Sequence, residues 1–117
     1  MKRMNDWQDI PAVRDAVDMI DQMVVLLRDR TRGGSSAYLL NYLSTIREGT
    51  PWSRKEAFKK IHVMCHPKGF GDLFVEGISS EDWWAHVEKL DEACSAAFAA
   101  LEEQFPTLSQ EEKLKKG

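Results

Sequence analysis

The sequence predicts an all-α fold: an antiparallel bundle of about four helices, with a short Gly-rich loop and an extended segment before the last long helix. Three observations predict it. Apolar residues recur at three- and four-residue steps in four separate segments. Glycine or proline follows each of these segments, as is typical where a helix ends. The connections between the segments are short, which favours antiparallel neighbours in a bundle.

The first helix is expected from about Pro11 to Arg30, with Asp9 at its N-cap and two glycines after its end. Its predicted buried stripe consists of Ile10, Val13, Val17, Ile20, Val24 and Leu27. The second helix is expected from Ser35 or Ser36 to about Glu48. Its broad apolar face contains Leu39, Leu40, Tyr42, Leu43 and Ile46.

The third helix is expected to begin at Ser53, which has the spacing of a capping box with Glu56. Its predicted apolar positions are Ala57, Phe58, Ile61, Met64 and Cys65. Proline disfavours helical geometry in the residue before it, so this helix should end near Pro67. From Pro67 to Ser79 the helical pattern is lost, which predicts a Gly-rich turn followed by a short extended segment.

The fourth and longest helix is expected to start after an N-cap at Ser79 or Ser80 and to end before Pro106. Its predicted buried stripe consists of Trp83, Val87, Leu90, Cys94, Ala97, Phe98, Leu101 and Phe105. These elements predict a single helical domain over residues 1–106. Five of the eleven residues 107–117 are charged, and this segment is expected to form a charged C-terminal tail.

Composition excludes several classes of protein. The net charge is −3, whereas a dedicated nucleic-acid binder is usually basic, so no nucleic-acid partner is expected. No run approaches the roughly 18 to 20 apolar residues of a membrane span, and the first residues do not resemble a signal peptide. We therefore expect a cytoplasmic protein that does not enter a membrane. Cys65 and Cys94 are expected to be reduced thiols in or near the core.

Chemistry-bearing residues are few. His62 and His66 are four residues apart, so on a helix they would share a face and could bind zinc through neutral imidazoles. The simpler interpretation is two histidines near a helix end beside a core cysteine. No nucleophile or phosphate-binding motif occurs, and the serines stand where helix caps are needed. We therefore expect no enzymatic activity, no cofactor and no metal, with the two histidines as the alternative.

Charge is distributed unevenly along the chain. Six basic and two acidic residues lie from Arg47 to Lys68, and seven acidic and one basic residue lie from Asp72 to Glu92. Such asymmetry can steer a charged partner. The partner-binding surface is predicted at Asp72, Glu76, Glu81, Asp82, Trp84 and Glu88. The alternative basic surface would consist of Arg54, Lys55, Lys59 and Lys60.

Trp84 belongs to this prediction for a geometric reason. Neighbouring residues on a helix point about 100° apart, so Trp83 and Trp84 are not expected to enter the same core. Trp83 lies on the buried stripe, which places Trp84 at its edge, where a tryptophan can anchor a partner. The same ring could instead cover the Gly-rich loop.

The stretch from His66 to Val75 resembles a family of small bacterial proteins of unknown function. In that family a Gly-rich G-x-G-S-x-N-D-L turn leads into a short apolar segment before the last helix. The helix order agrees from Val17 to Leu101, and the matching residues are Gly69, Gly71, Asp72 and Leu73. The Ser and Asn of the family pattern are missing here. Many members look like immunity proteins, encoded beside toxins of bacterial competition systems.

These observations favour a non-catalytic module that binds another protein, specifically an immunity-type protein that neutralises a cognate bacterial toxin. The first alternative is a helical regulatory or adaptor protein, of the kind that phages can encode, whose partner is not a toxin. The second is a small metal-binding protein or enzyme that uses His62 and His66.

Overall fold

Four α-helices and two short 3-10 turns make up the protein in a computed structural model, which describes residues 7–28, 35–73 and 75–106. The helices are α1 (Pro11–Arg28), α2 (Ser35–Glu48), α3 (Pro51–Met64) and α4 (Ser80–Gln104). The 3-10 turns are η1 (Trp7–Asp9) and η2 (Phe70–Asp72). No strand occurs among these residues, so the predicted all-α class is confirmed.

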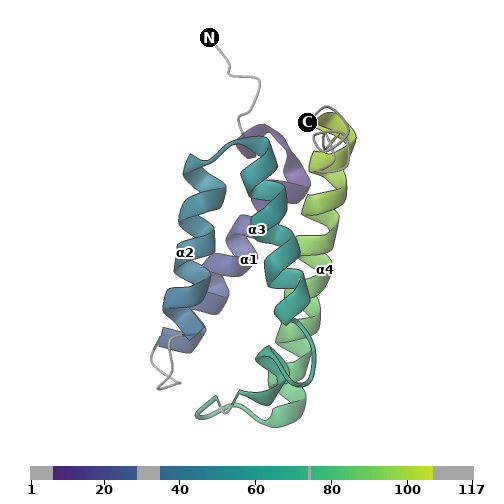
Figure 1. The fold of residues 1–117 in the computed structure, drawn as a ribbon. Helices are drawn as coiled ribbons and strands as arrows, with labels where there is room; N and C mark the ends of the chain where they lie inside the picture. Colours follow the sequence, from purple (N-terminus) through teal and green to yellow (C-terminus); the bar gives the residue numbers. More distant parts are fainter. Residues whose placement is uncertain (1–6, 29–34, 74, 107–117) are drawn as a thin grey trace, which may run out of the picture.

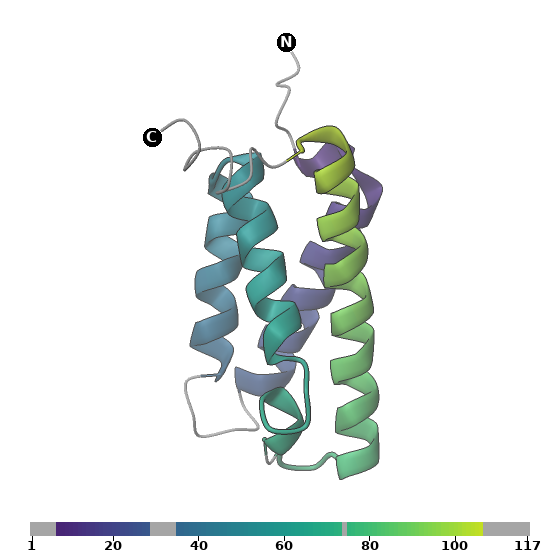
Figure 2. The same cartoon turned by 45° about the vertical axis from the view of Figure 1, so that its right-hand side comes forward.

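Successive helices run in opposite directions, as Figures 1 and 2 show. Each helix packs against two others, in the cyclic order α1, α2, α3, α4 and back to α1. The start of α1 and the end of α4 consequently lie at the same end of the bundle (Figure 2). None of the described helices combines the length and the apolar character that crossing a membrane requires.

One core lies between the four helices. The predicted stripes of α1 and α4 are buried almost throughout, and Phe98 and Phe105 are partly buried against the core. On α2 the core-facing residues are Leu39, Leu43 and Ile46, whereas Leu40 is 46% exposed and does not belong to the apolar face. Leu40 follows Leu39 directly, and the turn of about 100° per residue carries it out of the core.

The predicted N-cap of α4 agrees with the structure, whereas the predicted N-cap of α3 does not. Ser79 caps α4, and its hydroxyl accepts a hydrogen bond from the Asp82 N–H at 3.1 Å. The N-cap of α3 is Thr50, with Ser53 at the third helical position. The Thr50 hydroxyl accepts from the Ser53 N–H at 3.1 Å, and the Ser53 hydroxyl accepts from the Thr50 N–H at 2.8 Å. The predicted capping box of Ser53 with Glu56 is therefore wrong by one helical turn.

The start of α1 differs from the prediction, and its expected end is described only in part. Asp9, expected as the N-cap of α1, lies in η1, and Ile10 is the residue that directly precedes the helix. Residues 29 and 30, expected at its end, lie outside the described part of the chain, as do residues 107–117 of the predicted tail.

The connection between α3 and α4 is a turn followed by η2 and then irregular chain. Asp72, expected in the extended segment, belongs to the 3-10 turn, and Leu73 is the first extended residue after it. Gly77 adopts a positive φ of 82°, a conformation that glycine reaches without steric cost. The loop predicted before the last helix is present, and its first half is more compact than expected.

Truncating core residues tests this packing. Leu43→Ala and Leu90→Ala should each lower the free energy of unfolding by about 2 to 4 kcal/mol, because each removes a fully buried aliphatic side chain. Leu40→Ala, at an exposed position of α2, should change it by less than about 0.5 kcal/mol. Urea titrations followed by circular dichroism measure all three. Equal effects of Leu40→Ala and Leu43→Ala would contradict the assigned faces.

Candidate functional site

The start of α3 carries two basic residues that are buried, Arg54 at 5% and Lys55 at 3% exposure. The Arg54 guanidinium donates to the carbonyl oxygens of Ile46 and Arg47 in the last turn of α2. Lys55 Nζ donates to the Phe105 carbonyl at the end of α4, at 2.6 Å, and to Glu102 Oε1 at 2.9 Å. Both cations therefore cap the negative ends of helix dipoles.

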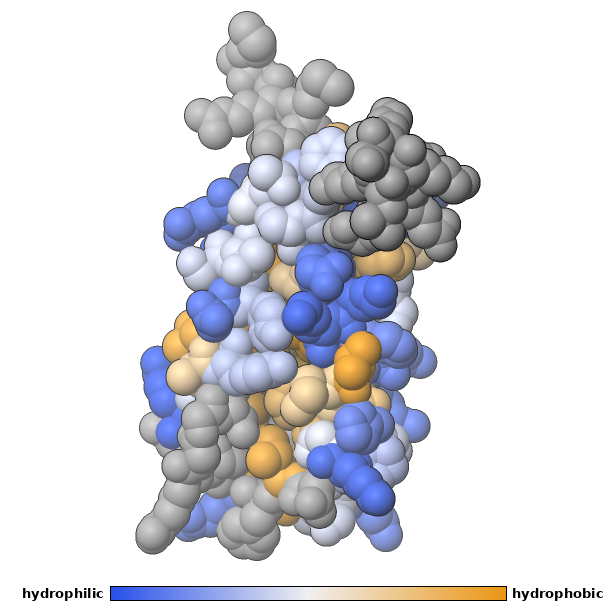
Figure 3. Space-filling model, viewed as in Figure 1, coloured by the Kyte–Doolittle hydropathy of each residue, from blue (hydrophilic) through white to orange (hydrophobic). Residues whose placement is uncertain are grey.

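This burial corrects the alternative basic surface. Arg54 and Lys55 face other helices and cannot meet a partner, so only Lys59 and Lys60 of the predicted set are exposed. Figure 3 shows hydrophilic side chains gathered over the middle of α3, with hydrophobic ones below them, toward the turn that follows the helix. Lys60 lies near Tyr38, where its charge opposes the rise in the Tyr38 pKa that the hydrogen bond with Tyr42 causes.

The predicted acidic surface is on the outside of the molecule. Glu76 precedes α4, Glu81 and Asp82 lie in its first turn, and Glu88 lies about two turns further on. All four side chains are exposed, and none makes an ion pair within the described residues. Asp72 contributes backbone to η2, and its side chain lies outside what the structure describes.

Trp84 lies at the edge of the buried stripe, as expected, but its ring covers the loop. A Cβ atom on Gly71 would lie 2.7 Å from Cζ3 of Trp84, so the indole rests directly on this glycine. Trp83 is buried, and its Nε1 donates to the Phe70 carbonyl at 2.6 Å. The two tryptophans thus hold η2 from two sides, and Trp84 is only half-exposed.

The two histidines of the metal hypothesis do not lie on one helix face. α3 ends at Met64, and His66 lies in the following turn, where its Nδ1 accepts a hydrogen bond from the Lys68 N–H at 3.2 Å. His62 directs its own Nδ1 toward Asp91 of α4. Over the described residues, no group of three or more His, Cys, Asp or Glu side chains is placed to hold a metal ion.

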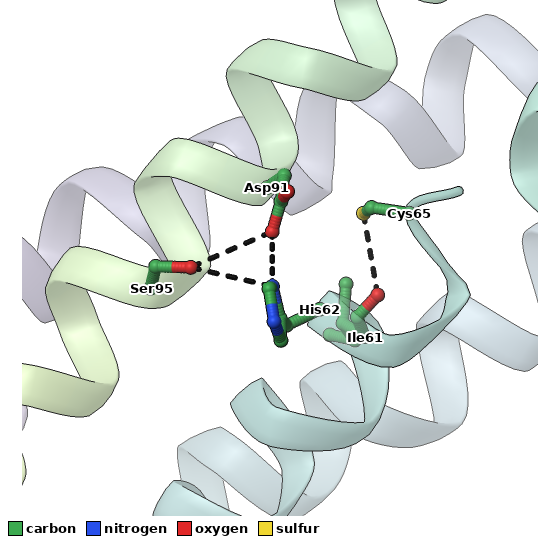
Figure 4. A network of polar contacts seen from close by, with 5 residues as sticks. All are labelled: Ile61, His62, Cys65, Asp91 and Ser95. Atoms are coloured by element: carbon green, nitrogen blue, oxygen red, sulfur yellow. Dashed lines mark hydrogen bonds and ion pairs between the residues drawn. The ribbon is translucent and has the colours of Figure 1, made fainter. Parts of the chain in front are cut away.

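His62, Asp91 and Ser95 form a polar network between α3 and α4 (Figure 4). The Ser95 hydroxyl lies 3.4 Å from His62 Nδ1 and 3.5 Å from Asp91 Oδ1. In a catalytic triad the acid and the nucleophile contact opposite nitrogens of the imidazole. Here both contact Nδ1, so the ring is not placed to pass a proton from the hydroxyl to a substrate. The network links two helices and does not form a serine nucleophile.

A pocket of about 290 Å³ lies beside this network, between α3 and α4. Its lining residues are Phe58, Lys59, His62, Cys94, Ser95 and Phe98. The sequence analysis names His62 as a candidate metal ligand and Cys94 and Phe98 as core residues of the last helix, and it does not name Ser95. The pairing of α3 with α4 brings these residues together, and no local spacing in either helix signals it.

Cys65 and Cys94 are buried free thiols, as predicted. The Cys65 thiol donates to the Ile61 carbonyl at 3.2 Å. Burial, with a smaller contribution from the Asp91 carboxylate, raises the pKa of Cys65 to about 12. Burial also raises the pKa of Cys94, and Cys65 and Asp91 add to that rise. Neither thiol is activated as a nucleophile, because a nucleophilic cysteine needs a lowered pKa.

Fold and site together define a small helical-bundle protein with a charged exterior. No family model matches the chain, and neither the curated proteins nor the solved structures contain a match to it.

Replacing Lys55 tests its role as a cap. Lys55→Ala should lower the free energy of unfolding by about 2 kcal/mol, because the Phe105 carbonyl and the Glu102 carboxylate lose a charged donor. Lys59→Ala removes the same charge from an exposed position of the same helix and should cost less than about 0.5 kcal/mol. Chemical denaturation measures both, and similar losses would contradict the assignment.

The buried thiols should make stability depend on alkaline pH. Unfolded cysteine titrates near pH 8.5, so above that pH the unfolded chain releases protons that the folded chain retains. Stability should therefore fall as pH rises from about 8 to 10, by about 2 kcal/mol for each thiol. The variant Cys65→Ala/Cys94→Ala should show a correspondingly shallower decrease in urea titrations across this range. Identical pH profiles for the two proteins would contradict the raised pKa values.

Proposed function

We propose that the protein is a non-catalytic module that binds another protein, and that it is an immunity-type protein which neutralises a cognate bacterial toxin in the cytoplasm without a cofactor. The observation that carries the proposal is the acidic surface of α4 and the turn before it. Glu76, Glu81, Asp82 and Glu88 are exposed, and none of them is neutralised by an ion pair within the described residues.

The packing and capping of α4 support this choice of surface. Glu81 and Glu88 are seven residues apart and therefore share one face of α4. Ser79 caps the helix. The positive end of the helix dipole stabilises the negative charges of Glu81 and Asp82 in the first turn. Because the opposite face of α4 is buried in the core, these carboxylates are held on a rigid element, which lowers the entropic cost of binding.

An unpaired acidic surface favours a partner with a basic surface. Complementary charges accelerate the encounter and disfavour wrong partners. Trp84 contributes less than an exposed tryptophan would, because its ring supports the loop at Gly71. The proposed contact residues are accordingly the carboxylates, with the free part of the Trp84 ring beside them. The proposal of an immunity role depends on the resemblance of the loop from Gly69 to Leu73 to the turn of the small bacterial family described above.

Co-expression tests the proposal. The products of the genes beside this one should be expressed singly in a heterologous bacterium, and at least one should stop growth. Growth should return when this protein is co-expressed, and the purified pair should bind directly, more weakly as salt concentration rises. If no neighbouring product is toxic, the immunity assignment is wrong. A non-toxic partner bound by the same surface would support the regulatory or adaptor alternative.

Matched variants locate the surface. Glu81→Gln/Asp82→Asn/Glu88→Gln should weaken binding at least about tenfold, because it neutralises the three α4 carboxylates of the proposed surface with little change in side-chain size. Asp15→Asn/Asp18→Asn/Glu103→Gln changes the net charge equally at exposed positions elsewhere and should have little effect. Equal losses of binding in the two variants would show that affinity depends on the net charge of the protein and not on the position of the carboxylates. A loss only in Lys59→Glu/Lys60→Glu would place the site on α3.

A further inference from the structure

The outer face of α3 carries four exposed side chains in one row. Trp52, Glu56, Lys59 and Val63 follow one another at steps of four, three and four residues, so they lie on one face of the helix. Trp52 is 47% exposed and Val63 is 57% exposed. α3 packs against α2 on one side and α4 on the other, which leaves this row as its outer face. These four residues are the α3 stripe.

The α3 stripe has apolar side chains at its ends and opposite charges in its middle. Neither Glu56 nor Lys59 makes an ion pair with another of the residues that the structure describes. The Trp52 ring packs edge-to-face against Phe105, with ring centroids 5.9 Å apart, so the indole is supported from one side and open on the other. Tryptophan is enriched among the residues that contribute most to protein interfaces.

The α3 stripe is complementary to its own reverse. The midpoint between Trp52 and Val63 is also the midpoint between Glu56 and Lys59, and it falls at the middle of α3. When a twofold axis at this point relates two antiparallel copies of α3, Trp52 opposes Val63 of the second copy, and Glu56 opposes Lys59 of the second copy. A parallel pair of helices would instead bring each charge against its own kind, which is unfavourable.

We propose that the protein forms a symmetric dimer in which the α3 stripes of two copies pack antiparallel. The two contacts between Trp52 and Val63 supply affinity, and the two ion pairs between Glu56 and Lys59 fix the direction and register of the helices. One face of a 14-residue helix offers less than the roughly 1,200 Å² of a standard interface, so the dimer is weak, with a Kd of about 100 μM. The stripe contains none of the α4 carboxylates that carry the proposed function.

Analytical ultracentrifugation of the full chain tests the dimer. Between about 10 μM and 1 mM protein, the average mass should rise from near that of one chain toward that of two. Val63→Asp places a charge opposite Trp52 of the second copy and should raise the Kd at least about tenfold. Val25→Asp is the matched control, because Val25 is 56% exposed on α1, and it should leave the Kd unchanged. A monomer throughout this range, or equal responses to the two variants, would overturn the proposal.

Exchanging the two charges tests the register of the dimer. Glu56→Lys and Lys59→Glu each bring like charges together, so each variant alone should associate at least about tenfold more weakly. The double exchange Glu56→Lys/Lys59→Glu restores opposite charges and should return the Kd to within about threefold of its original value. A mixture of the two single variants should form a heterodimer for the same reason. Asp15→Lys, which changes the net charge as Glu56→Lys does but on the exposed face of α1, should have little effect.

Circular dichroism verifies that each variant is folded. Single variants that associate as strongly as the unchanged protein, or a double exchange that does not restore association, would overturn the α3 stripe as the interface. A dimer that persists in every stripe variant would place the contact elsewhere and would equally contradict the proposal. These measurements involve no partner protein, so their outcome is independent of the co-expression experiment.

Discussion

The arrangement of the bundle depends on two adjacent buried cations at the start of α3. Arg54 donates to the last turn of α2, and Lys55 donates to the end of α4 and to Glu102. A buried charge is costly unless it is paired, and here the partners are carbonyls at helix ends that need donors. The first turn of α3 thus donates hydrogen bonds to carbonyls at the ends of both α2 and α4. These bonds hold α3 between the two helices. The remaining contacts of α3 follow from that position.

The position of α3 also determines which charged side chains are exposed on the surface. Lys55 and His62 both contact α4, and the pocket lined by residues of α3 and α4 lies between these two contacts. Two of the four cations in the predicted basic surface, Arg54 and Lys55, are buried and bind helix ends, and the other two, Lys59 and Lys60, are exposed. On α4, by contrast, Glu81, Asp82 and Glu88 are exposed and make no ion pair within the described residues. This difference favours the acidic surface over the basic one as the place where a protein partner would bind.

Periodicity within single helices was sufficient to predict the fold, because the buried faces of α1 and α4 repeat at helical spacing. Ser79 was predictable as a cap from local chemistry, and Thr50 could have been found from Pro51, since proline is common at the first helical position. The burial of Lys55 was not predictable, because its partners lie about 50 residues away in the chain. The same holds for Asp91 and Ser95 beside His62. Local patterns do not encode which turns of two distant helices meet.

The turn between α2 and α3 has no room for a side chain at Gly49. A Cβ atom on Gly49 would lie 2.4 Å from the Thr45 carbonyl oxygen and 2.2 Å from the Ser53 hydroxyl, so only glycine is accommodated there. An inserted or deleted residue beside it would rotate Arg54 and Lys55 by about 100° and remove both from their carbonyls. Homologous chains should therefore keep the length of this turn. Insertions and deletions should accumulate between α3 and α4, around Gly77, where a substituent would meet open space.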